Sequence, residues 1–271
     1  MSKLKILYVA TEISPFLKTT DVADYVRQLP EKMQQRDFEV RILVPRFGVI
    51  NERKNRLHEV VRLSGINISV ADDEKPLVIK VASIPTAKLQ VYFIDNEDLF
   101  HRKRIYTDEE GNYFEDNDDR AIFFCKGVIE TVKKLGWAPD IVHCNDWISA
   151  LLAPYLKVTY KNDPLFKDSK VLYTIYNNAI PQKFSDNLIQ KAMIQDLNEK
   201  MLEGLKSADY EGFTKIGTQY ADRVTLANNE VKPQLNGTLD DVAHEIIENG
   251  DDLIDKYEEI YQEMAGVKAA G

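Results

Sequence analysis

The sequence predicts an α/β fold: a single Rossmann-like, doubly wound domain with a predominantly parallel sheet and a C-terminal helical tail. Two observations support this prediction. Residues 4–10 form a continuous apolar run, which is typical of a strand covered on both faces. Apolar residues at helical spacing then predict a helix over 22–36, and a second strand follows at 38–44. This succession of strand, helix and strand indicates a right-handed parallel crossover.

The remaining elements continue the alternation of strands and helices. Further strands are predicted over 66–70, 77–84, 89–94, 140–144, 170–176 and 222–226, and further helices over 117–135, 147–161 and 208–221. Pro30 lies inside the first helix, where we expect a kink. The segment 57–94 contains three strands with no helix between them, so we expect it to leave the parallel sheet as a β-hairpin. No strand is predicted after residue 226.

The chain is predicted to divide into a body, residues 1–237, and an acidic helical tail, residues 238–271, that packs back on the body. Residues 238–264 contain ten acidic residues and one basic residue, Lys256, so this stretch carries −9. The whole chain also carries −9, from 35 Lys and Arg against 44 Asp and Glu, so the rest is balanced. Two tail helices are expected. The first is marked by Leu239, Val242, Ile246 and Ile247, and the second by six apolar residues from Leu253 to Met264.

Composition excludes several classes of protein. Apolar residues make up 44% and charged residues 29%, as in an ordinary soluble globular chain. The acidic balance disfavours nucleic acid as a partner, because such binding rests on neutralising phosphates. No apolar run is long enough to span a membrane, and the N-terminus lacks the pattern of a secretory signal. Two cysteines, Cys125 and Cys144, are expected to be reduced thiols of a cytoplasmic protein.

Residues that follow strands are the candidate site, because ligands of open parallel sheets bind beyond the carboxyl ends of strands. Lys18 precedes the start of the first helix and could help to hold an anion there. Alternatively, Thr20 or Asp21 caps the helix and Lys18 is solvated. After the strand at 140–144, Asp146 can cap the next helix. His143 is either a hydrogen-bonded structural residue or a general base.

No cofactor is expected from the residues alone. The four histidines are scattered along the chain and the two cysteines lie nineteen residues apart, so no metal-ligand spacing exists. No Gly-x-Ser-x-Gly, Walker-type or dinucleotide-binding glycine pattern occurs. No catalytic residue can therefore be assigned from the residues alone.

The motifs KILYVATEISPFLK, VADYVRQLP and FEVRILVPRFG begin a long resemblance to a known family. It is strongest through VYFIDNEDLFHRKRIYTDEEGNYFEDNDDRAIFFCKGVIE and GWAPDIVHCNDWISALLAPYLK, and it ends in GTQYADRVTLAN. Over residues 3–228 the chain resembles the N-terminal domain of bacterial glycogen synthases and plant starch synthases, glycosyltransferase family 5.

The resemblance implies one half of a GT-B fold, in which two Rossmann-like domains face each other across a cleft. It implies transfer of glucose from ADP-glucose to an α-1,4-glucan, with retention and without a metal. By the same resemblance, Lys18 belongs to the Lys-x-Gly-Gly loop that approaches the donor diphosphate. Tyr176 and Asn177 occupy the positions of a His-Asn pair that contacts the sugar. His143 and Asp146 belong to the His-x-x-Asp-Trp motif that lines the cleft.

Departures from the family pattern change the expectation. Thr20 and Asp21 stand in place of two glycines, and Tyr176 in place of the family histidine. No residues match the family's C-terminal nucleotide-binding domain, although the second tail helix looks like the family's last helix. We therefore expect a glycogen synthase-like protein of α-1,4-glucan biosynthesis that is catalytically degenerate alone.

The alternative is a non-catalytic, regulatory protein that binds glucan or a partner enzyme. The expected partners are α-glucan or a protein of glycogen metabolism. ADP-glucose is a doubtful ligand, and a homo-oligomer is a further candidate assembly.

Overall fold

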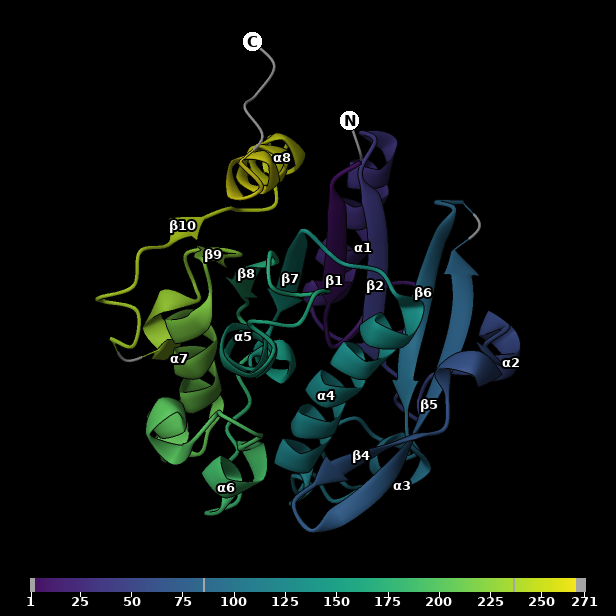
Figure 1. Cartoon of the computed structure of the whole chain (residues 1–271), viewed down its shortest axis with the longest axis vertical. Helices are drawn as coiled ribbons and strands as arrows, with labels where there is room; N and C mark the ends of the chain where they lie inside the picture. Colours follow the sequence, from purple (N-terminus) through teal and green to yellow (C-terminus); the bar gives the residue numbers. More distant parts are fainter. Residues whose placement is uncertain (1–2, 85, 236, 267–271) are drawn as a thin grey trace.

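In the computed structural model, which describes residues 3–84, 86–235 and 237–266, an open ten-stranded sheet runs through the molecule (Figure 1). The strands are β1 (Lys5–Val9), β2 (Glu39–Pro45), β3 (His58–Glu59), β4 (Ile66–Val70), β5 (Asp73–Ile84), β6 (Leu89–Asp95), β7 (Ile141–Asn145), β8 (Lys170–Ile175), β9 (Arg223–Leu226) and β10 (Glu245–Ile246). Their order is β10-β9-β8-β7-β1-β2-β6-β5-β3, with β4 paired to β5. All pairs from β10 to β6 are parallel, so the predicted fold class is confirmed.

Helices cover both faces of the sheet. They are α1 (Val22–Gln35), α2 (Glu52–Asn55), α3 (Glu97–Phe100), α4 (Asn117–Leu135), α5 (Leu152–Pro154), α6 (Leu188–Ala192), α7 (Tyr210–Tyr220) and α8 (Leu253–Met264). On β1, Leu7 and Val9 join the core that includes α4, α5 and α7, whereas Ile6 and Tyr8 join the core that includes α1 and α8. This alternation explains why the strand is apolar throughout. No helix among the described residues is long and apolar enough to cross a membrane.

The segment predicted to leave the parallel sheet does so. β5 pairs antiparallel with β3, β4 and β6, while β6 returns to pair parallel with β2. The first helix, α1, includes Pro30.

Two predicted helices are wrong. Residues 147–161 form a 3₁₀ turn (Trp147–Ser149), the short α5 and a π turn (Tyr155–Thr159). Pro154 accounts for part of this irregularity, because it lacks the N–H that a continuous α-helix would require. The first tail helix is absent: Glu245 and Ile246 instead form β10, parallel to Thr225 and Leu226 of β9. Sheet hydrogen bonds at this edge override the apolar spacing.

The second tail helix is present as α8, and it lies on the sheet beside α1 (Figure 1). The side chains of Leu253, Tyr257 and Tyr261 are fully buried. Two arginines of the body contact its acidic face: Arg36 pairs with Asp255 at 2.6 Å and with Glu258, and Arg223 pairs with Glu263 at 2.5 Å. The exact division into residues 1–237 and 238–271 stays a prediction.

Candidate functional site

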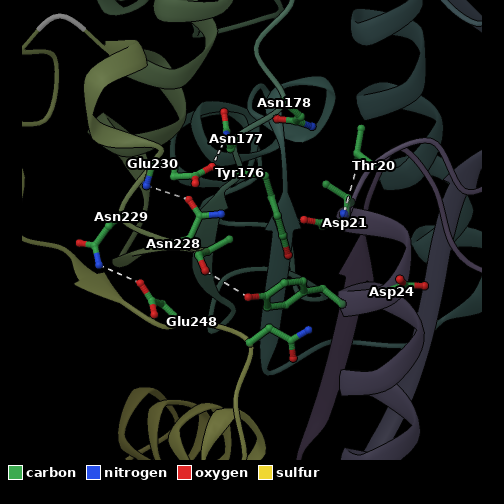
Figure 2. Close-up of a pocket in the computed structure, with 14 residues that line it drawn as sticks. Thr20, Asp21, Asp24, Tyr176, Asn177, Asn178, Asn228, Asn229, Glu230 and Glu248 are labelled. Carbon is green, nitrogen blue, oxygen red and sulfur yellow. Dashed lines mark hydrogen bonds between the residues drawn. The ribbon is translucent and has the colours of Figure 1, made fainter.

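A cavity of about 540 Å³ opens at the carboxyl ends of β8, β9 and β10, beside the start of α1 (Figure 2). Its walls come from four segments that are far apart in the sequence: residues 20–25, 176–178, 227–230 and 248–249. Each segment except the first begins one or two residues after a strand, which is where a parallel sheet places its ligand sites. We call this cavity the strand-end pocket.

Carboxylates and amides dominate the strand-end pocket. The carboxylates belong to Asp21, Asp24, Glu230 and Glu248, and the amides to Asn177, Asn178, Asn228, Asn229 and Asn249. No lysine, arginine or histidine occurs among the described residues that line it. Some of these groups bond to one another: Asn177 donates to Glu230, and Asn229 donates to Glu248, each at 2.8 Å (Figure 2). The pocket is therefore acidic and rich in groups that bind hydroxyls.

Lys18 lies next to the pocket but does not line it. Its ammonium donates to Asp24 at 2.6 Å, and its side chain is 57% exposed. The hydrogen bond to Asp24 raises the pKa of Lys18. Because its charge is matched by Asp24, Lys18 adds little positive potential to a pocket that already holds three other carboxylates.

The carboxylate of Glu12 lies inside the loop after Lys18 and accepts hydrogen bonds from it. Glu12 is 2% exposed. The backbone N–H groups of Thr19 and Thr20 donate to its two oxygens at 2.6 and 2.8 Å. The hydroxyls of the same threonines donate to it at 2.8 and 2.5 Å. The loop therefore already holds an anion, and these backbone donors are not free for a ligand. Sequence reasoning gave Glu12 no role, because its position three residues after β1 does not reveal where its side chain points.

His143 lies away from the pocket, in the interior under α8. Its Nδ1 is 2.8 Å from the hydroxyl of Tyr261, and its Nε2 is 2.7 Å from that of Thr174. Burial lowers the pKa of His143 to about 3, so the ring is neutral at physiological pH. With both ring nitrogens hydrogen-bonded inside the protein, the geometry is that of a structural residue.

Asp146 is also buried, and its backbone is strained at φ 65° and ψ 179°, a region used almost only by glycine. Its carboxylate accepts from the N–H of Ile148 at 3.1 Å, which is the capping role expected from the sequence. It also accepts from the hydroxyl of Thr11. Burial raises the pKa of Asp146 to about 7. The structure thus places it against Thr11, in the segment after β1, and not in the lining of the pocket.

Tyr176 and Asn177 do line the strand-end pocket. The Tyr176 hydroxyl donates to Asn145 at 2.7 Å, and its ring packs edge-on against Tyr25 with centroids 5.5 Å apart. Tyr176 is 3% exposed and forms the floor, whereas Asn177 is exposed. Of the five sequence-predicted positions, these two share one cavity, and Lys18, His143 and Asp146 lie outside its lining.

The site also contains residues that sequence reasoning missed. Asn228, Asn229 and Glu230 lie within four residues of the end of β9, so applying the strand-end rule to the predicted strand 222–226 would have found them. Glu248 could not be found in this way, because its segment was predicted as a helix.

One metal-like cluster occurs among the described residues, formed by Glu52, Asp95 and His101. Lys80 contacts both carboxylates, at 2.6 Å to Glu52 and 2.9 Å to Asp95. Arg46 also pairs with Glu52. Since two side-chain cations already neutralise these acids, the cluster is an ion-pair network and not a metal centre.

Comparison with known proteins identifies similar chains. A family model described as the starch synthase catalytic domain matches residues 5–241. The glycogen synthase of Chlorobium limicola is 34% identical over 238 residues, which cover 88% of this chain and 48% of that protein. The glycogen synthase of Chlorobaculum tepidum is 38% identical over 242 residues, with the same coverage of both chains. The chain thus spans about half the length of the curated relatives it matches.

A solved structure has the same fold. It is the catalytic domain of starch synthase IV from Arabidopsis thaliana bound to ADP and acarbose, with a TM-score of 0.71 and 18% sequence identity. The match covers 88% of this chain and 50% of that chain.

Proposed function

The chain belongs to the starch synthase catalytic domain family, and from this premise we propose that it binds α-1,4-glucan in the strand-end pocket and does not bind ADP-glucose. It is a glycogen synthase-like protein that acts in glucan biosynthesis as a binding component. The observation that carries this proposal is the chemistry of the pocket: four carboxylates, five amides and no cationic lining residue among those described.

A nucleotide-sugar donor fits this pocket poorly. A diphosphate requires backbone N–H groups or cationic side chains. Two of the loop donors are bonded to Glu12, and Lys18 is bonded to Asp24. Asp21 places a further negative charge where the family has glycine, so like-charge repulsion opposes the diphosphate.

An uncharged glucan fits it well. Sugar hydroxyls both donate and accept hydrogen bonds, so they can pair with carboxylate oxygens and with amide groups alike. The volume of about 540 Å³ lies within the range of small-molecule sites. A second cavity of about 580 Å³ shares Asn177 and Asn178 with the first, and the two together can follow an extended oligosaccharide.

The protein acts in the cytoplasm, together with a partner enzyme. Cys125 and Cys144 are both free thiols, which supports the cytoplasm, where thiols stay reduced. The partner is an enzyme of glycogen metabolism that carries out the transfer on the same glucan.

Calorimetric titration with maltoheptaose tests the proposal. We expect a saturable heat from the wild-type chain and at least a fivefold weaker Kd for Asn228→Ala and Glu230→Ala. Asn187→Ala is the matched control, because Asn187 is exposed, lies outside the pocket and makes no side-chain capping bond. Heats indistinguishable from dilution for the wild-type chain, or equal losses for the control variant, would refute glucan binding in this pocket.

A further inference from the structure

A separate cavity, of about 420 Å³, lies between β4, α4 and α6, away from the strand-end pocket and its neighbouring cavity. Figure 1 shows β4 beside α4, with α6 at the same end of the molecule. Part of its lining is apolar, from Ile68, Met193 and Ile194. The partly buried amine of Lys126 reaches it from α4.

Lys126 has no acidic partner among the residues that the structure describes. Its Nζ donates to the backbone carbonyl of Ser69 in β4 at 2.8 Å, and no carboxylate of the described residues lies within 4.0 Å of it. The other charged groups that line the cavity are already paired. Glu130 bonds to Lys133 at 3.1 Å, and Lys191 bonds to Asp119 at 2.9 Å and to Asp118 at 3.3 Å.

The charged form of this amine is therefore disfavoured. Burial lowers the pKa of Lys126 to about 8, so about half of the amine is the free base at pH 8. Pairing with acids raises the pKa of Lys18, Lys80, Lys133 and Lys191 instead. Among the described lysines with a shifted pKa, only Lys126 is thus shifted towards a reactive amine at neutral pH.

We propose that Lys126 is an acylation site that takes short acyl groups from acyl phosphates. The nitrogen lone pair attacks the acyl carbon and forms the C–N bond. The bond from that carbon to the phosphate oxygen breaks, inorganic phosphate leaves with the electron pair, and the amine proton passes to solvent.

The acylated side chain of Lys126 is more favourable in this partly buried cavity than the charged ammonium is. An amide nitrogen keeps one N–H, which can continue to donate to the Ser69 carbonyl, and it buries no charge. The acyl group meets the apolar wall formed by Ile68, Met193 and Ile194. The site therefore tolerates the modification without loss of the contact between β4 and α4.

Acetyl phosphate and peptide mapping by mass spectrometry test this inference on the full chain. Lys134 is the internal control, since it lies two turns further along α4 and also donates to a backbone carbonyl, that of Ser64 at 2.9 Å, but is exposed. At pH 8 we expect Lys126 to be acetylated at least fivefold faster than Lys134. In 6 M guanidinium the two rates should become equal.

The pH profile gives a second readout. Between pH 8 and 9 the rate at Lys126 should rise less than twofold, because the amine is then mostly free base. An amine with the usual pKa near 10.4 gains about tenfold in free base over the same range. The proposal is overturned if Lys126 reacts no faster than Lys134 in the folded chain, or if its rate rises about tenfold between pH 8 and 9.

Discussion

The hydroxyl of Tyr261 lies 2.8 Å from Nδ1 of His143, which joins helix α8 to the middle of the central strand β7. Tyr257, one turn earlier on α8, places its hydroxyl 3.3 Å from those of Thr174 and Thr225. All of these side chains are buried, so α8 is attached to the sheet by polar as well as apolar contacts. The helix is a structural part of the body and not an exposed acidic extension.

Removing the side chain of Tyr257 should therefore lower the free energy of unfolding. Replacing a fully buried aromatic residue by alanine costs about 3–5 kcal/mol, so Tyr257→Ala should lower the melting temperature by about 6–20 °C. Glu259→Ala, on the exposed face of the same helix, is the control. Deleting residues 251–271 should lower the melting temperature further or cause aggregation. A deletion variant that melts within a degree of the intact chain would show that α8 is not needed.

Acid should destabilise the folded chain, because it protonates the buried His143 that contacts Tyr261 of α8. Its pKa is about 3 in the folded chain and near 6.5 when unfolded, so unfolding takes up a proton between these values. The contribution of His143 to stability is complete above pH 6.5 and is lost as the pH falls towards 3. From pH 7 to pH 5 this loss is about 2 kcal/mol.

Urea unfolding at both pH values measures the effect. The free energy of unfolding should fall by about 2 kcal/mol less between pH 7 and 5 in His143→Gln than in the wild type. His58→Gln, at an exposed site, should behave as the wild type does. Identical pH dependence in His143→Gln and the wild type would contradict a buried, neutral His143.

The two cysteines should be unreactive in the folded chain. Cys125 and Cys144 are fully buried, and burial raises the pKa of both thiols, so neither offers an accessible thiolate. A thiol reagent such as Ellman's should find no reactive thiol in native protein and two after denaturation without reductant. A count of zero after denaturation would mean that they are oxidised.

The chain should also show no glucosyl transfer from ADP-glucose. Asp21 and the Glu12-filled loop oppose the diphosphate, and Tyr176 replaces the histidine expected from the family pattern. Radiolabelled glucose from ADP-glucose should not enter glycogen above the blank without protein. Incorporation in proportion to the amount of this chain would contradict the proposed role as a binding component.

Much of the fold was predictable because local signals and tertiary packing agree. The helix predicted over 117–135 has these bounds in the structure, with Gly136 in the left-handed conformation at its end. Strands buried on both faces were found from their apolar runs alone. The spacing of apolar residues predicted a helix where sheet pairing instead forms β10. It also predicted one continuous helix over 147–161, where Pro154 contributes to the irregularity.

The site was less predictable, since it depends on which strand ends meet. The sequence places Tyr176 and Asn177 after a strand, but it does not show that Glu230 and Glu248 face them across one cavity. It also does not show that His143 points to the interior under α8, because side chains alternate between the two faces of a strand. Such placements depend on strand order and register.

Side-chain amide resonances offer the most direct test of the central claim, because five asparagines line the strand-end pocket. In ¹⁵N-labelled protein, maltoheptaose should shift the side-chain amides of Asn177, Asn228 and Asn229 in a saturable manner. ADP-glucose at the same concentration should leave them unchanged. Shifts of these resonances by ADP-glucose, with none from maltoheptaose, would contradict the account.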